Sequence, residues 1–371
     1  MSAMSDALAS GDLDAVREAK IEVDVEEAQR KQEVKRRLNQ STRAPIVLLS
    51  EADFHLRPPT AFLVQGLILE KSIGSFVGSP GSLKTFTATD LALSIASHQP
   101  TWLGRTLTKS GPVVYVLGEG GGRFSYRVKV WKQERQITDD LPFFIVPHPL
   151  NLRDPELMAE FLTMIVDHHP VITVFDTLNT CTPGMKENMA EEMSEAVAAM
   201  RLLTESTGGT VIHLHHPRKD EASARGSGAN LGAIDFELWM KKTSDKSLFT
   251  LSVGKSREAD DELEINLKKK VVELAGKFED DGTPVTSCVV ELADAAYIAK
   301  SLATLERKIL ELVRNNPNIP RREVTPRLGL RQKTVENAID TLLLDQQVEE
   351  IKGGRGNRQV LLRIKQIVVN P

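Results

Sequence analysis

Residues 78–85 read GSPGSLKT and follow an apolar run at residues 73–77. The eight residues are Gly78, Ser79, Pro80, Gly81, Ser82, Leu83, Lys84 and Thr85. Small residues between a strand and a helix let backbone N–H groups close around phosphates. Lys84 can reach the β and γ oxygens, and Thr85 can offer its hydroxyl to Mg²⁺. The stretch therefore predicts a phosphate-binding loop for a Mg²⁺-bound nucleotide.

The loop departs from the usual pattern at one position. Glycine is expected where Leu83 stands, and a leucine there requires an ordinary backbone conformation. This departure bears on nucleotide affinity more than on the location of the site. A chance turn of Gly and Ser is the alternative interpretation of the same residues.

Short apolar runs alternate with helical patterns on both sides of the loop. Buried strands are expected at Ile73–Val77, Val113–Leu117, Phe143–Val146, Val171–Phe175, Val211–Leu214 and Phe236–Met240. Hairpin strands are expected after them at Ser247–Gly254, Glu262–Leu267 and Lys270–Leu274. The alternation predicts an α/β domain with a mainly parallel sheet, edge hairpins and ligands at the carboxyl ends of the strands.

Two of these runs end in an acid at the expected ligand edge. Glu119 follows residues 113–117 and precedes three glycines, and Asp176 follows residues 171–175. Glu119 is a candidate general base for an attacking water, and Asp176 can support Mg²⁺. A solvated loop acid and a helix-capping aspartate are the respective alternatives. Arg123 and Arg127 are expected to begin the next helix as surface charges.

The run at residues 211–214 ends among His213, His215 and His216. Zinc is one interpretation, but strand alternation sends His216 to the face opposite His213 and His215. The favoured interpretation makes His216 a polar sensor of the γ-phosphate, and His213 a core histidine with its hydrogen bonds satisfied.

Composition narrows the class of protein. The 371 residues are 41% hydrophobic with a formal net charge of −4, and the apolar runs are too short to span a membrane. The start, MSAMSDALASGDLDAV, has no secretory leader pattern, so we expect a cytoplasmic protein without a membrane partner. The two cysteines, Cys181 and Cys288, exclude a disulfide framework.

The two ends of the chain differ from the middle. Residues 1–44 have the composition of a weakly amphipathic helical arm, which is either a frayed tail or a helix that docks on a neighbouring subunit. Residues 301–371 carry thirteen Lys and Arg against eight Asp and Glu. Because this end is basic, we assign residues 300–371 to a separate module and residues 45–299 to the α/β domain.

The basic module has the pattern of a winged helix-turn-helix. Helices are expected at Arg321–Leu328 and Lys333–Asp345, and strands at Val348–Ile351 and Gln359–Ile364. Duplex DNA is the expected partner, since several side chains could reach bases or phosphates. They are Arg331, Gln332, Lys333 and Thr334 on the second helix, and Lys352, Arg355 and Arg358 on the wing. Protein binding is the alternative, because Glu336, Glu349 and Glu350 make this face less basic.

Across residues 61–274 the ordered set of motifs resembles the RecA-like hexameric replicative helicases of the DnaB and plasmid RepA type. The motifs are GSPGSLKT, VVYVLGEG, VITVFDT, VIHLHHPRK, ARGSGANLGAID and VGKSR. The resemblance implies a RecA-like P-loop ATPase core with ATP and Mg²⁺ as cofactors. It also implies Glu119 as the catalytic base and His216 as the sensor.

The same resemblance implies a homo-hexamer whose ATP sites are completed across subunit boundaries. Lys255 and Arg257 are the candidate residues acting in trans, with Arg225 as the rival finger. Single-stranded DNA is expected in a central channel, held by Arg218, Lys219 and Arg225 of one loop and by Lys186 of a second. Replication proteins are further expected partners.

Three functional hypotheses follow. The first is an ATP-dependent DNA helicase or translocase of phage or plasmid replication. The second is a RecA-type DNA-binding ATPase for recombination, partition or helicase loading. The third is a nucleotide-sensing transcription regulator, which the departure at Leu83 keeps open and which would be a dimer with a palindromic site and negligible turnover.

Overall fold

The structure is a computed structural model of the chain. It describes residues 20, 47–119, 121–185, 190–217, 234–243, 247–256, 263–330, 332–352 and 360–365. The arm expected at residues 1–44 lies outside the described residues, apart from Lys20 in a helical conformation.

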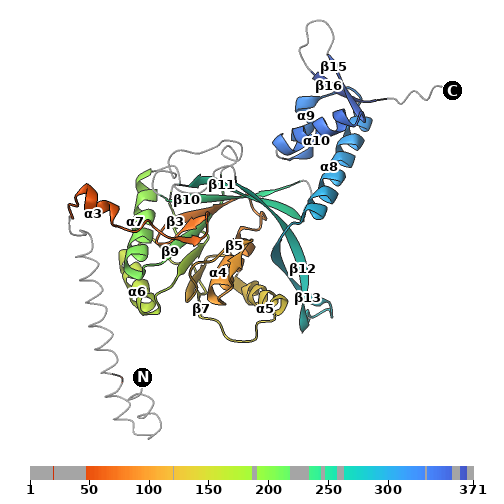
Figure 1. The fold of residues 1–371 in the computed structure, drawn as a ribbon. Coiled ribbons are helices and arrows are strands. Elements are labelled where there is room, and N and C mark those ends of the chain that lie inside the picture. The colour runs from red at the N-terminus through yellow and green to blue at the C-terminus, as the bar shows by residue number, and fades with distance from the viewer. Residues whose placement is uncertain are drawn as a thin grey trace, which may run out of the picture.

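A nine-stranded sheet forms the centre of the molecule (Figure 1), in the order β13-β12-β11-β10-β3-β9-β8-β6-β7. Its strands from β10 to β7 are parallel. Their bounds are β3 (Ile73–Val77), β6 (Val113–Leu117), β7 (Phe143–Val146), β8 (Ile172–Asp176), β9 (Thr210–His215) and β10 (Phe236–Lys242). The predicted α/β fold with a mainly parallel sheet is confirmed, and the carboxyl ends of these strands share one edge.

Helices cover both faces of this sheet (Figure 1). On one face lie α4 (Lys84–Ala96) and α5 (Phe124–Glu134), and on the other α6 (Pro155–Ile165) and α7 (Ala190–Thr207). Neighbouring strand residues alternate between the two cores: Tyr115 packs with α4, whereas Val114 and Val116 pack with α6 and α7. Continuous apolar strands are therefore explained by burial on both faces.

The strand β7 lies at the edge of the sheet, with Phe144 40% and Ile145 42% exposed. The prediction of a strand at Phe143–Val146 is confirmed, but the prediction that it is buried is wrong. An apolar run of four residues does not distinguish a central strand from an edge strand.

The antiparallel edge consists of β11 (Leu248–Ser256), β12 (Glu264–Phe278) and β13 (Pro284–Leu292). The two strands predicted between Glu262 and Leu274 are one continuous strand, so that prediction is wrong. Lys268 and Lys269, which separate the two predicted strands, lie within β12. Lys268 and Lys270 form ion pairs with Glu291 of β13, which the sequence pattern did not predict.

Smaller elements surround this core. They are α3 (Glu51–His55), the strand pairs β1 (Phe62–Val64) with β2 (Ile68–Leu69) and β4 (Thr101–Trp102) with β5 (Arg105–Thr106), and the 3₁₀ turns η1 (Gly121–Arg123) and η2 (Val166–His168). No helix in the described part of the chain is both long enough and apolar enough to cross a membrane.

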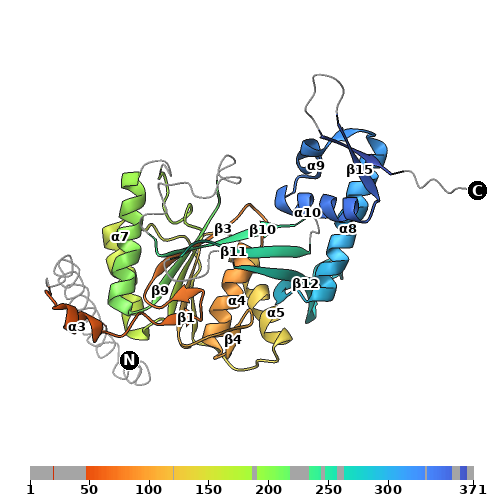
Figure 2. The same cartoon turned by 45° about the horizontal axis from the view of Figure 1, so that its top comes forward.

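The described residues from 295 to 365 form what we call the C-terminal unit. They comprise α8 (Ala295–Asn315), β14 (Ile319–Pro320), α9 (Arg321–Leu328), α10 (Gln332–Leu344), β15 (Val348–Lys352) and β16 (Val360–Ile364). The strands pair antiparallel in the order β14-β16-β15, over an apolar core of their own that includes Leu305, Ile309 and Val335. Figure 2 shows α8 running from the sheet to this unit, so the predicted boundary at residues 299/300 falls inside a helix.

Candidate functional site

The loop at residues 78–85 joins the end of β3 to the start of α4. Gly78 has no room for a side chain, because a Cβ there would lie 2.4 Å from the Met240 carbonyl oxygen. Gly81 has a φ of 71°, which glycine adopts without strain. The backbone of this loop therefore depends on its glycines.

Leu83 adopts a left-handed conformation with a φ of 69°, so the expectation of an ordinary backbone there is wrong. The turn into α4 imposes this conformation, which costs a non-glycine residue about 1–2 kcal/mol. The Leu83 side chain is 8% exposed and packs in the core beside α4. Burial of a leucine contributes about 1.5–3 kcal/mol and offsets the strain.

Lys84 is 5% exposed at the start of α4. Its Nζ donates to the carbonyl oxygens of Gly78 at 2.6 Å and Ser79 at 3.2 Å, and lies 3.1 Å from Nδ1 of His216. Burial lowers the pKa of Lys84 to about 8, although Asp176 and Glu119 act in the opposite direction. Because burial disfavours the charged form of the Lys84 amine, an anion bound beside it would stabilise that charge.

Asp176 ends β8 and is 2% exposed. Its Oδ2 accepts a hydrogen bond from the Tyr115 hydroxyl at 2.9 Å, and its Oδ1 accepts one from Thr85 Oγ1 at 3.3 Å. Burial raises the pKa of Asp176, and the two hydroxyl donors oppose that rise. A hydroxyl and a carboxylate so close together are oxygen ligands that fit Mg²⁺. The buried Ser82 Oγ, in the same loop, has no hydrogen-bond partner among the described residues.

Glu119 lies just beyond β6, on the exposed side of the same edge. Its Oε1 accepts a hydrogen bond from Thr177 Oγ1 at 3.0 Å, which ties it to the segment after β8. Gly118 permits this approach, since a Cβ there would lie 1.8 Å from Thr180 Oγ1. The carboxylate is thus oriented by a neighbouring strand end while one side stays open to solvent.

The histidines of β9 differ in environment. His213 is buried, and burial lowers its pKa to about 3. Its Nδ1 has no hydrogen-bond partner among the described residues, so the prediction of a fully satisfied core histidine is wrong for that atom. His216 lies beyond the strand, with Nδ1 3.2 Å from the Gly78 carbonyl oxygen. The described residues contain no group of three His, Cys, Asp or Glu placed to hold a metal ion, and the zinc interpretation gains no support.

These elements enclose a cavity of about 330 Å³. We call it the loop cavity. Its lining residues are Pro80, Gly81, Ser82, Leu83, Lys84, Thr85, Phe86, Glu119, Arg127, Asp176, Thr177 and His216. Lys84, Glu119, Asp176 and His216 come from four different strand ends, and the structure brings them together at one edge.

Two cations near the loop cavity were not among the sequence candidates. Arg127 lines it, with Cζ 4.8 Å from the centre of the Phe86 ring; the expectation of a surface charge at this position is wrong. The helical spacing of four between Arg127 and Trp131 could have indicated an inward face. Lys242, at the end of β10, donates from Nζ to the Pro80 carbonyl oxygen at 2.8 Å. No sequence pattern around Lys242 indicated that its side chain would reach the loop.

Lys255 is not in the loop cavity of its own chain. It pairs with Glu237 near the amino end of β10, whereas the loop leaves the carboxyl end of β3. Its Nζ donates to the Ile234 carbonyl oxygen at 2.6 Å. The other candidates of this group lie outside the described residues: Lys186, Arg218, Lys219, Arg225 and Arg257.

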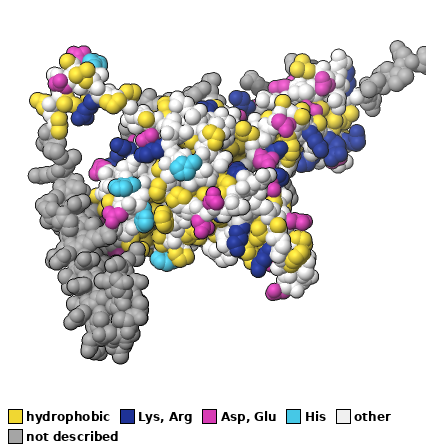
Figure 3. Space-filling model, turned by 60° about the horizontal axis from the view of Figure 1, so that its bottom comes forward, with side chains coloured by type: hydrophobic (Ala, Val, Ile, Leu, Met, Phe, Trp, Pro, Cys, Tyr) yellow, Lys and Arg dark blue, Asp and Glu magenta, His cyan; other side chains and the backbone are white. Residues whose placement is uncertain are grey.

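In the C-terminal unit, Gln332, Lys333 and Thr334 lie in the first turn of α10. Gln332 Nε2 donates to Glu336 at 2.7 Å, and Lys333 is exposed. Lys352 ends β15, while Arg331, Arg355 and Arg358 lie outside the described residues. Figure 3 shows Lys and Arg side chains gathered along one edge of this unit.

A second cavity, of about 520 Å³, lies between α9, α10 and the start of β16. Arg321, on its wall, forms ion pairs with Asp340 and Glu350 at 2.5 Å each. The charges around this cavity therefore include acids that compensate its arginines.

Comparison with known proteins gives one family and a distant structural likeness. The family model described as "AAA domain" matches residues 37–222, which is half of the chain. No curated protein matches the sequence. Among solved structures, the crystal structure of the RadB recombinase matches at 14% identity with a TM-score of 0.41. That match covers 54% of this chain and 87% of the other.

Proposed function

Since the chain belongs to the AAA domain family, we propose that it hydrolyses ATP in the loop cavity and moves on single-stranded DNA. The single observation that carries this proposal is the convergence of Lys84, Glu119, Asp176 and His216 around one cavity. Their residue types match the needs of phosphoryl transfer, which depends on positioning and on stabilising charge.

Each residue has a proposed role. Lys84 binds the β- and γ-phosphates in place of the carbonyl oxygens that it now contacts. Thr85 and Asp176 would hold Mg²⁺, which when bound neutralises charge on the phosphate oxygens. Glu119 acts as the general base that orients and deprotonates the attacking water.

His216 is proposed to report the state of the γ-phosphate. Its ring touches Lys84 and the loop, and residue 218 begins the segment expected to grip single-stranded DNA. A change in the hydrogen bonds of the His216 ring on hydrolysis would therefore be felt next to Arg218 and Lys219.

Assembly into a ring is proposed from the position of Lys255. Because β11 carries Lys255 away from the loop cavity of its own chain, any role for Lys255 in hydrolysis requires a neighbouring copy. A guanidinium supplied in trans stabilises charge on the γ-phosphate and links turnover to movement between subunits. Arg225 remains the rival residue, and a homo-hexamer is the proposed assembly.

The DNA contacts are proposed on charge and topology. Lys186, Arg218, Lys219 and Arg225 would line the channel for single-stranded DNA. The order helix, strand, two helices and two strands in the C-terminal unit supports a winged helix, for which duplex DNA is the proposed ligand. The α8 helix adds exposed cations at a spacing of seven, Lys300, Arg307 and Arg314.

The mass of the assembly, measured with an ATP analogue and single-stranded DNA alongside turnover, tests this function. The expected result is a ring of several copies with DNA-stimulated hydrolysis of ATP. A dimer with negligible turnover would contradict it and favour a nucleotide-sensing regulator. Unwinding of a forked duplex, alone or with replication proteins, then separates a helicase from an ATPase of recombination, partition or loading.

A further inference from the structure

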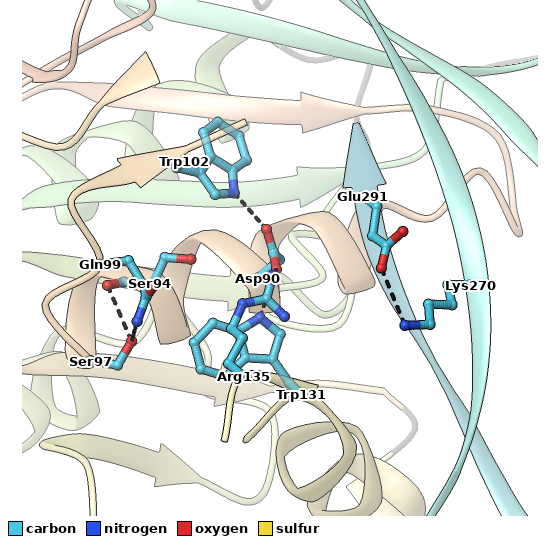
Figure 4. Close-up of polar contacts among 9 residues, drawn as sticks. All are labelled: Asp90, Ser94, Ser97, Gln99, Trp102, Trp131, Arg135, Lys270 and Glu291. Atoms are coloured by element: carbon cyan, nitrogen blue, oxygen red, sulfur yellow. Dashed lines mark hydrogen bonds and ion pairs between the residues drawn. The ribbon is translucent and has the colours of Figure 1, made fainter. Parts of the chain in front are cut away.

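A polar cluster outside the loop cavity joins α4 to α5. Asp90, 3% exposed on α4, accepts three hydrogen bonds (Figure 4). Trp102 Nε1 donates to Oδ2 at 2.9 Å, while Trp131 Nε1 and Arg135 Nη2 donate to Oδ1 at 2.6 Å each. Two of the three tryptophans of the protein thus bind a single carboxylate.

Two rows of side chains face each other between the two helices, and we call them the ladder: Phe86 and Asp90 from α4, and Arg127, Trp131 and Arg135 from α5 and its C-terminal cap. Arg127 and Trp131 are four residues apart on one face of α5, and Arg135 follows four residues later as the C-terminal cap of the helix. Phe86 and Asp90 are four residues apart on α4. Arg127 stacks on Phe86, and the next step pairs Trp131 and Arg135 with Asp90. One step is about 6 Å along either helix axis, so the two rows match.

Burying the Asp90 carboxylate beside a partly exposed Arg135 is an expensive way to join two helices. Burial raises the pKa of Asp90, and Arg135 and the two indoles oppose the rise. Apolar side chains of similar volume would pack as stably. Hydrogen bonds add a fixed register between the two helices. An apolar contact tolerates a shift of one helix along its axis, whereas three hydrogen bonds to one carboxylate do not.

Arg127 lies four residues before Trp131 on the same helix. Arg127 is the first residue of the ladder and lines the loop cavity, which Asp176 and Glu119 also line. The opposite side of α5 is held separately, because Gln133 hydrogen-bonds Glu273 and Ala275 of β12.

We propose that Asp90 is a positioning residue that sets the register of α5 on α4 and so holds Arg127 against the phosphates of a bound nucleotide. This inference rests on the proposed function and adds to it a cation from the same chain as the phosphate loop. Arg127 touches the nucleotide, and Asp90 acts only through it.

A double-mutant cycle on the full chain tests the inference through kcat/KM for ATP. Arg135→Gln loosens the ladder, and Arg127→Ala removes the residue that the ladder holds. Each should lower kcat/KM about tenfold or more, because small displacements at a reacting centre are costly. If Asp90 acts through Arg127, Arg135→Gln has no further effect in the Arg127→Ala background. Additive losses would overturn the inference.

Matched substitutions guard against a general loss of structure. Lys132→Gln removes a charge from the same helix without touching Asp90 and should stay within about twofold of the parent. Trp131→Phe repeats the cycle by removing the indole donor of α5 instead of the Arg135 guanidinium. Its control is Trp102→Phe, which removes an indole donor that belongs to β4 rather than α5. Equal losses in the two tryptophan variants would also overturn the inference. No turnover in the parent would contradict the proposed function itself, whereas normal parent turnover with additive losses would contradict only the role of Asp90.

Discussion

The loop cavity and the C-terminal unit differ in where their charged side chains lie and in what those side chains contact. In the loop cavity, Lys84 and Asp176 are almost fully buried and rest against carbonyl and hydroxyl groups. In the C-terminal unit, Arg321 binds Asp340 and Glu350, and Arg363 binds Glu349, on the surface. The first region has buried charges that a ligand would complement, and the second pairs some of its charges with each other at the surface.

This difference shows where single substitutions should matter. Desolvated charges in a cavity interact strongly, so removing one changes binding or catalysis by orders of magnitude. Surface ion pairs contribute about 0–1 kcal/mol, so the C-terminal unit should act through several weak contacts.

The largest effect is expected for Glu119→Gln in the loop cavity. Loss of a general base lowers turnover by about 10²–10⁴ while nucleotide binding is retained. Steady-state ATP hydrolysis and equilibrium nucleotide binding on the same preparation measure both. Glu195→Gln, which removes an exposed acid paired with Arg153 on the other face, is the matched control and should be silent. Equal turnover in Glu119→Gln and the parent would refute the assignment.

Removal of residues 295–371, which include the whole of α8, should separate the two regions. Duplex DNA affinity is expected to fall about tenfold or more, because several phosphate contacts are lost together. Turnover of ATP and affinity for single-stranded DNA should be preserved, since their residues lie elsewhere. Titration of labelled duplex and single-stranded DNA measures the split. Unchanged duplex affinity would favour protein docking by the C-terminal unit.

The buried imidazole of His213 should make the stability of the protein depend on pH. The pKa of His213 is about 3 in the folded protein and about 6.5 when unfolded. The unfolded chain therefore binds the extra proton between these values, and stability falls as the pH drops below 6.5. Between pH 7.5 and 5.5 the parent should lose about 1.4 kcal/mol more than His213→Leu. Urea unfolding at both pH values checks this, and identical losses would contradict it.

The smallest effect is expected at the residue that departs from the loop pattern. Leu83→Gly relieves about 1–2 kcal/mol of left-handed strain and removes about 1.5–3 kcal/mol of leucine burial. The two terms nearly cancel, so stability should fall by about 1 kcal/mol and ATP affinity should change by less than about threefold. Thermal unfolding and nucleotide titration measure these. A tenfold change in affinity would show that Leu83 tunes the site after all.

The parallel strands were predictable because burial on both faces leaves an uninterrupted apolar run, as at Val113–Leu117. Residues at the carboxyl ends of these strands could be chosen as site candidates, because a parallel sheet binds its ligands at that edge. Glu119 and Asp176 were chosen in this way. The length of β12 was not predictable, since lysines that form cross-strand ion pairs have the same local pattern as a turn. The edge position of β7 depends on which strand lacks a neighbour, and a local pattern does not carry that information.

Within the candidate site, what escaped prediction depends on tertiary packing. Leu83 takes its left-handed backbone because the turn into α4 demands it and the core accepts its side chain. Arg127 lies at the cavity because α5 packs on α4, where the Arg127 guanidinium stacks on Phe86, 41 positions earlier in the sequence. Lys255 lies away from the loop because β11 runs antiparallel to β10. Each of these facts depends on how helices and strands pack in three dimensions, which a local sequence pattern does not show.

Calorimetric titration of a non-hydrolysable ATP analogue with Mg²⁺ tests the central claim most directly, which is that the four strand-end residues enclose one nucleotide. The parent chain should bind one nucleotide per copy. Lys84→Ala should bind none, while the exposed lysine variant Lys333→Ala should bind as the parent does. Equal binding by Lys84→Ala and the parent, or no binding by either, would contradict the account.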